Sequence, residues 1–295
     1  MTRIQFDPAA KLNLVFWGDP QISPVETGRV QRFTAACNAV RDAQGHADAV
    51  LISGDIAEFG REAEYAAVAD CLKAAAENAD AIVCCTGNHD VRIRPYKSQL
   101  RRFRAFLCDV PKAPMCPYDR YYFSTEIGGF PLIVMGADRN SFESAYIGKA
   151  QLAFVEAELR KAQAEGKPAF VLNHQPLNRT NGLPVTWEGR GSWRGGLGMQ
   201  SNKLRDILTS HGHVFYLTGH LHYGVSGFNV ENSGRLHMLA APSVGCANHG
   251  PNGVLGQGFV LSLYEDKLVG TAYDFVNAAP LDQTIPNARF EIALR

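Results

Sequence analysis

The first half of the sequence alternates short apolar segments with longer segments of helical periodicity. Residues 12–18, 48–53 and 80–86 are apolar runs of strand length, and the intervening segments 26–44 and 61–77 carry apolar residues at helical spacing. Strands that are joined by helical crossovers of this length pair in parallel, because a tight turn cannot connect parallel neighbours. The pattern therefore predicts an α/β fold.

The second half of the sequence has a different rhythm. We expect a hairpin at 120–137, helices at 149–164 and 201–211, strands at 168–173 and 213–218, and a meander of short strands over 223–275. No internal repeat, low-complexity tract or linker interrupts the 295 residues. We therefore expect one domain over residues 1–295.

A polar cluster follows each of five predicted strands. The five clusters are Asp19-Pro20-Gln21, Gly54-Asp55, Gly87-Asn88-His89-Asp90, Asn173-His174 and Gly219-His220-Leu221-His222. Sites in α/β sheets form outside the carboxyl ends of the strands, so these clusters are expected to meet at one edge. They supply carboxylate, amide and imidazole groups, which suit manganese, iron or zinc. The pattern favours a metal site.

Glycine precedes a candidate ligand in three of these clusters, at Gly54, Gly87 and Gly219. A residue without a Cβ lets the chain turn sharply off a strand and lets the backbone approach a ligand closely. A single Gly-Asp pair is more often a turn than a ligand, and a single histidine at a strand end is more often structural. The recurrence of polar clusters after five apolar strands is what favours the metal site over turns.

The order of these motifs resembles that of the calcineurin-like metallophosphoesterase family, with Asp-x-His, Gly-Asp, Gly-Asn-His-Asp/Glu, a strand-end His and Gly-His-x-His. The similarity runs from Asp19 to His222. It implies a sandwich of two mixed β-sheets flanked by helices. It also implies a dinuclear site for divalent manganese, iron or zinc at the carboxyl ends of the strands.

Matched by position, the resemblance implies one bridging ligand and three further ligands for each ion. The bridging ligand would be Asp55; the first ion would also be held by Asp19, Gln21 and His222, and the second by Asn88, His174 and His220. His89 would not be a ligand but would act as the general acid, since imidazole titrates near neutrality. Asp90 would orient His89.

Gln21 departs from the family pattern, which most often has histidine at this position. An amide oxygen is a weaker, neutral donor, so we expect the first ion to be held more loosely and zinc to be less favoured than manganese or iron. Alternatively, Gln21 hydrogen-bonds a bridging water. Glu58 stands where many relatives have aspartate, a position that usually does not contact the ions directly.

The resemblance implies hydrolysis of a phosphate ester by a metal-bridging hydroxide. Phosphodiesters are slightly favoured, because Gly-Asn-His-Asp with His89 retained is similar to the diesterase branches of the family. The alternatives are a phosphomonoesterase and a non-catalytic metal-binding scaffold of the same fold. The nearly complete ligand set and the presence of His89 favour an enzyme.

Residues 176–200 form a long loop that begins just after His174 and contains six glycines. Loops of this length in compact domains are usually functional or disordered. Arginine suits phosphate oxygens and tryptophan can stack on a ring. The substrate-contact candidates are Arg179, Trp187, Arg190, Trp193 and Arg194 in this loop, and Arg92 outside it. The alternative is a packing or oligomer-contact loop. Residues 242–256, with His249, are a further candidate wall.

The charge composition limits the kinds of partner that the protein is expected to bind. Lysine and arginine (29) balance aspartate and glutamate (29), which argues against broad binding of nucleic acid or anionic membranes. The resemblance implies a small phosphorylated substrate, possibly a nucleotide. No apolar run approaches the roughly 18–20 residues of a membrane span. The seven cysteines have irregular spacing, and the N-terminus lacks a signal-peptide pattern. We therefore expect reduced thiols and a cytoplasmic protein.

Overall fold

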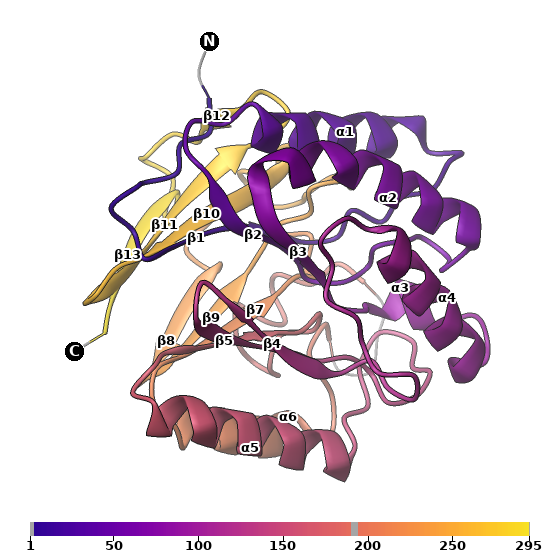
Figure 1. Ribbon diagram of the computed structural model, residues 1–295, viewed down its shortest axis with the longest axis vertical. Helices are drawn as coiled ribbons and strands as arrows, with labels where there is room; N and C mark the ends of the chain where they lie inside the picture. Colours follow the sequence, from indigo (N-terminus) through magenta and orange to yellow (C-terminus); the bar gives the residue numbers. More distant parts are fainter. Residues whose placement is uncertain (1–2, 190–193, 295) are drawn as a thin grey trace.

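The computed structural model describes residues 3–189 and 194–294, which form two mixed β-sheets packed face to face (Figure 1). Helices α1 (Thr27–Arg41) and α2 (Glu62–Ala75) lie on the outer side of one sheet, and α5 (Lys149–Ala164) and α6 (Ser201–Thr209) lie on the outer side of the other. The predicted α/β sandwich of two mixed sheets flanked by helices is therefore confirmed.

The first sheet contains the three strands that alternate with helices at the start of the chain. Its strands in spatial order are β12 (Ala279–Pro280), β11 (Lys267–Asp274), β10 (Gln257–Leu263), β1 (Leu12–Trp17), β2 (Ala47–Ile52) and β3 (Ala79–Cys84), and β13 (Arg289–Ala293) pairs with β11. Strands β1, β2 and β3 are parallel, as predicted. A short 3₁₀ turn, Ala76–Asn78, links α2 to β3.

The second sheet begins with the predicted hairpin. Its strands in spatial order are β4 (Phe123–Ile127), β5 (Phe130–Val134), β6 (Ala169–Leu172), β7 (Val214–Thr218), β9 (Leu236–Ala240) and β8 (Val230–Ser233). The central strands β5, β6, β7 and β9 run parallel, and the two edge strands are antiparallel to their neighbours. Helices α5 and α6 are the crossovers between β5, β6 and β7.

The short strands predicted over 223–275 are present, but they do not form one meander. Strands β8 and β9 join the second sheet, whereas β10 and β11 cross to the first, where β10 pairs with β1. All seven residues of β10 are buried, so this strand needs neighbours on both edges and cover on both faces. Helices α3 (Asn88–Val91) and α4 (Tyr96–Asp109) and the short terminal strands were not predicted.

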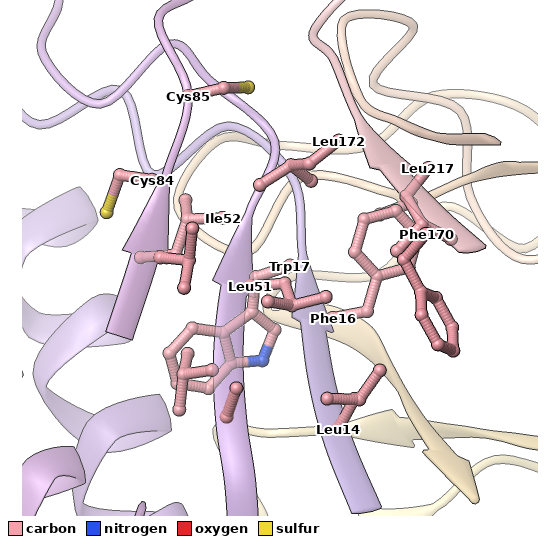
Figure 2. Packing of buried hydrophobic residues seen from close by; sticks show 14 of the residues in the cluster. Leu14, Phe16, Trp17, Leu51, Ile52, Cys84, Cys85, Phe170, Leu172 and Leu217 are labelled. Carbon is pink, nitrogen blue, oxygen red and sulfur yellow. The ribbon is translucent and has the colours of Figure 1, made fainter. Parts of the chain in front are cut away.

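Strand β1 is buried on both faces, which explains its continuous apolar run. Figure 2 shows Leu14 and Phe16 on the side of β1 that faces Phe170 of β6. Trp17 points the other way and makes edge-on contacts with Phe33 of α1 and with Phe275, at ring-centroid distances of 5.7 and 5.2 Å. The core therefore continues from the inter-sheet layer to the helical layer.

Hydrogen bonds join the carboxyl ends of strands from different sheets. The backbone N–H of His220, after β7, donates to Asp19 Oδ2, after β1, at 2.9 Å. The ring Nδ1 of His174, after β6, lies 2.7 Å from the carbonyl oxygen of Ser53, after β2. The strand ends of both sheets thus meet at one place. Within the described ranges, no helix is both long and apolar enough to cross a membrane.

Candidate metal centre

Two groups of potential metal ligands lie at this meeting point and share one carboxylate. Asp55, His174 and His220 form one group, and Asp19, Asp55 and His222 form the other; within each group the ligand atoms lie within 4.8 Å of one another. His174 Nε2 is 3.3 Å from Asp55 Oδ2, and His222 Nε2 is 3.2 Å from Asp19 Oδ1. Asp55 is placed to contact two ions.

The backbone at these strand ends is unusual. The φ angles of Asp19, Gln21, Asp55, His220 and His222 are 49°, 44°, 46°, 72° and 50°. Non-glycine residues rarely adopt this left-handed region, and each instance costs on the order of 1–3 kcal/mol. Such strain concentrates at functional sites, where the surrounding structure fixes it. Here it turns the chain sharply as it leaves each strand.

His220 presents a buried nitrogen with no partner. Its ring is 3% exposed, and Nε2 has no hydrogen bond to any described residue. Burial, reinforced by the positive charge of His174, lowers the pKa of His220 well below its usual range. Leaving a buried polar atom unpaired costs about 1–3 kcal/mol. The nitrogen that faces another candidate ligand is Nδ1, which lies 3.1 Å from His174 Nε2. A neutral imidazole can offer the lone pair of one ring nitrogen to a divalent cation, so the residues present fit a metal ion.

The charge of Asp55 fits the same conclusion. Burial opposes its ionisation, but the positive charges of His174 and His89 outweigh burial and hold the pKa of Asp55 well below its usual range. Asn88 Oδ1 lies 2.9 Å from His174 Nε2 and completes a set of carboxylate, imidazole and amide donors. This set suits manganese, iron or zinc better than a purely oxygen-preferring ion.

Two of the predicted glycines leave room for the carboxylates. A Cβ at Gly87 would lie 2.0 Å from Asp55 Oδ1, and one at Gly219 would lie 2.5 Å from Asp19 Oδ2. Neither distance is sterically possible, so each carboxylate packs directly against the backbone of a neighbouring strand end. The backbone N–H of His89 donates to Asp55 Oδ1 at 2.8 Å in this arrangement.

His89 lies beside the ligand groups without joining them. Its Nε2 is 3.9 Å from Asp55 Oδ2, and its Nδ1 is 3.1 Å from Glu58 Oε1. Burial lowers the pKa of His89, but the negative charges of Asp55 and Glu58 outweigh it and the net direction is upward. A raised pKa favours the protonated imidazole, the form that a general acid needs.

Glu58 connects several residues of the site. Its carboxylate accepts hydrogen bonds from Gln21 Nε2 at 3.0 Å and from Arg29, and it lies 3.7 Å from Arg92. Burial raises the pKa of Glu58, but hydrogen bonds from His89 and Arg29 outweigh burial and lower it to about 2. Glu58 is therefore ionised and holds the His89 ring.

Gln21 is oriented by its neighbours. Its amide nitrogen faces Glu58, while its Oε1 accepts from the thiol of Cys246 at 3.2 Å. The opposite orientation of the Gln21 amide would place its oxygen against the Glu58 carboxylate, which is unfavourable. Glu58 therefore fixes the observed orientation, with the amide nitrogen toward the carboxylate. In this conformation the Gln21 oxygen is already hydrogen-bonded.

Asp90 does not contact the His89 side chain, contrary to the expectation that it orients the ring. Its carboxylate accepts from the backbone N–H groups of Gly87, Ile56 and Ala57 at 2.8, 3.2 and 3.1 Å and from the Tyr65 hydroxyl at 3.0 Å. A short side chain that satisfies three backbone donors cannot also reach the imidazole. Asp90 instead fixes the turns that carry Asp55 and Asn88.

A cavity of about 350 Å³ opens over the ligand groups. Its floor is formed by candidate ligands and His89, and its walls by the segments that follow β5, β6, β7 and β9. The wall residues are Glu143, Trp187, Glu188, Gly189, Leu221, Ala247, Asn248 and His249. The Trp187 ring stacks on His220 at a centroid distance of 4.4 Å and an interplanar angle of 26°. The 176–200 loop and the 242–256 segment therefore both contribute walls.

The sequence model of the family described as Calcineurin-like phosphoesterase matches residues 12–224. The chain belongs to this family. Members of this family are metal-dependent phosphoesterases, a class of hydrolase, and the family uses a dinuclear metal site. The resemblance on which the ligand expectations depend is confirmed.

The chain is distantly similar to one named relative. A "Probable cyclic nucleotide phosphodiesterase" of Rhodococcus erythropolis (strain PR4 / NBRC 100887) is 26% identical over 180 residues, which is 61% of this chain and 52% of the relative. The chain thus spans about half the length of this relative.

Two solved structures share the fold. A dimetal phosphatase from Danio rerio superposes with a TM-score of 0.68 at 13% identity, covering 97% of this chain and 100% of that one. The purple acid phosphatase PPD1 from yellow lupin (Lupinus luteus) gives 0.62 at 13% identity, covering 96% of this chain and 53% of that one. At these identities the likeness concerns the fold alone.

The predicted substrate-contact residues of the phosphoesterase lie in different places. Trp187 lines the cavity, whereas Arg179 and Arg194 line a separate hollow together with Arg205. Arg92 lies behind His89, near Glu58 and Glu143, and is not among the cavity-lining residues. Arg190 and Trp193 lie outside the described residues. Within the described chain, the arginine candidates thus do not reach the cavity.

Glu143 is a site residue that the sequence interpretation missed. It lies in the irregular segment between β5 and α5, and no motif surrounds it. Its contact with Asn88 spans 55 residues, so only the folded chain reveals it. His249, whose role was left open, is a wall residue and its Nδ1 lies 3.2 Å from Glu188.

Replacing Gly87 with alanine is expected to disturb the metal centre. The backbone φ of Gly87 is −102°, which alanine tolerates, so the effect arises from the clash of the new methyl group with Asp55. We expect a loss of bound metal and a fall of about 1–3 kcal/mol in the free energy of unfolding. Denaturant unfolding and elemental analysis measure the two effects. Gly212→Ala is the control, because its Cβ would meet nothing within 4 Å; equal behaviour of the two variants would contradict the prediction.

Proposed function

We propose that this phosphoesterase hydrolyses a small phosphodiester and that His89 protonates the leaving alkoxide. Asp55 would contact both ions. The first ion would also be held by Asp19, Gln21 and His222, and the second ion by Asn88, His174 and His220. The bound ions supply Lewis-acid chemistry, which polarises the phosphoryl group and activates water as a nucleophile. Manganese, iron and zinc all suit this donor set.

The charge of the cavity wall carries the preference for diesters. The described residues that line the cavity include no arginine or lysine, and they include the carboxylates of Glu143 and Glu188. A monoester dianion carries an additional negative charge that such a wall repels, whereas a diester carries a single one. The name of the Rhodococcus relative, a probable cyclic nucleotide phosphodiesterase, supports the same preference.

His89 supports the proposed proton transfer. Its Nδ1 faces Glu58 at 3.1 Å, which leaves Nε2 on the side of Asp55 and the cavity. With Nδ1 directed at Glu58, Nε2 is the nitrogen that remains to donate a proton to a leaving group. The Trp187 ring stacks on His220 and forms part of the cavity wall.

The proposal is tested with protein that is stripped of metal and reloaded with manganese. We expect kcat/KM for bis(p-nitrophenyl) phosphate to exceed that for p-nitrophenyl phosphate by about tenfold or more, which corresponds to about 1.4 kcal/mol of transition-state free energy. A preference for the monoester would establish the phosphomonoesterase alternative. If neither ester reacts with manganese, iron or zinc although ions bind, the scaffold alternative replaces the proposal.

A further inference from the structure

Glu143 makes a specific contact with a candidate ligand. Its Oε2 accepts a hydrogen bond from Asn88 Nδ2 at 3.2 Å, and its side chain is 16% exposed. Its backbone carbonyl accepts from Gln175 Nε2 at 3.2 Å, which ties this segment to the residue after His174. The guanidinium of Arg92 lies 4.0 Å from the carboxylate. The Glu143 side chain is therefore held from several directions.

An asparagine side chain ligates a cation only through its oxygen. The two ends of the amide have nearly the same shape, so its orientation depends on the groups that each end contacts. In this site Oδ1 of Asn88 faces His174 at 2.9 Å, and Nδ2 faces Glu143. Rotating the amide by half a turn would point its N–H groups at the metal site and its oxygen at a carboxylate.

We propose that Glu143 is a positioning residue that holds Asn88 with its amide oxygen toward the metal site. The inference rests on the proposed role of Asn88 as a ligand. Groups that orient metal ligands typically change metal affinity by 10- to 100-fold when they are removed. The affinity of the protein for the second ion would therefore depend on Glu143, in the loop between β5 and α5.

Glu188 provides a matched control. It is also a carboxylate in the cavity wall, but its side chain is 71% exposed and its ionic partner is His249, which is not a candidate ligand. A general effect of negative charge near the ions would appear in both glutamates. An effect that depends on the Asn88 hydrogen bond would appear only at Glu143.

The experiment measures manganese binding to stripped protein by calorimetry, with metal content after dialysis against a weak chelator as a second readout. We expect Glu143→Leu to lower the affinity of the protein for the second ion by about 10- to 100-fold. Glu143→Gln should stay within about threefold of wild type, because an amide oxygen can accept the same hydrogen bond. Glu188→Leu should bind as wild type does. Circular dichroism verifies folding, and Glu143→Met replaces the leucine variant if that variant does not fold.

Two outcomes overturn the inference. One is wild-type affinity for manganese in the apolar Glu143 variant. The other is an equal loss of manganese affinity in Glu143→Gln and Glu143→Leu, which would show that the charge of Glu143, and not its hydrogen bond, determines the affinity. Asn88→Ala separates the inference from the proposed ligand set. If Asn88→Ala still binds two ions, the ligand set itself fails; if it loses one ion while Glu143→Leu keeps both, only the inference fails.

Discussion

Replacing His89 with alanine is expected to lower kcat/KM for a phosphodiester with an alkyl leaving group by a factor of about 10²–10⁴, the usual contribution of general acid catalysis. A p-nitrophenolate leaving group needs little protonation, so the same substitution should slow bis(p-nitrophenyl) phosphate much less. The difference between the two substrates measures proton donation by His89 directly, because a structural defect would slow both.

Metal content is the control for the His89 variant. His89 lies outside both ligand groups, and its Nε2 is 3.9 Å from Asp55, so His89→Ala should retain two ions per chain. An equal loss of activity with both leaving groups would contradict the role of general acid. Loss of metal would show that His89 supports the centre itself.

Replacing Asp55 with alanine is expected to remove both ions and to lower diester turnover by more than about 10³-fold, because both metal-dependent functions are lost together. The reason is that Asp55 belongs to both ligand groups, whereas each of the other four residues in those groups belongs to one. Elemental analysis and steady-state turnover measure the two losses.

Asp70→Ala is the control for the Asp55 variant. Asp70 is an exposed carboxylate paired with Lys73 on α2, and it belongs neither to the ligand groups nor to the cavity lining. It should retain wild-type metal content and turnover. If Asp55→Ala keeps two ions, the assignment of Asp55 as the shared ligand is wrong.

The location of the candidate ligands could be predicted from the sequence because the direction of a strand, and therefore which residues follow its carboxyl end, can be read from a short segment. An apolar run that ends at Trp17 or Ile52 identifies a buried strand, and parallel pairing brings the residues that follow, Asp19 and Asp55, to the same edge. The resemblance of the motif order to the family then supplied the candidate ligands without any knowledge of the turns. The left-handed φ angles that aim these side chains appear only in the structure.

Contacts between distant segments were harder to predict. Asp90 follows His89 directly, yet its carboxylate is taken up by backbone donors, and Glu58, 31 residues away, contacts the ring instead. Arg179 shares a loop with Trp187, but the two side chains line different hollows. Sequence proximity does not determine which way a side chain points when the chain turns between two residues.

The same limitation affected the end of the chain. The segment 257–263 has the composition of any buried strand, and nothing local indicates that it pairs with β1 rather than with β9. The choice depends on which sheet edge remains open after the first 240 residues have folded. This is a property of the whole topology.

The central claim is that phosphate ester hydrolysis in this chain depends on two metal ions bound at the shared Asp55 centre. The most direct test is a stepwise manganese titration of stripped protein, with bound metal and diester turnover measured in the same samples. We predict two ions per chain at saturation, no turnover without metal, and turnover that rises as the second ion binds. Turnover in the metal-free protein equal to that of the loaded protein would contradict the claim.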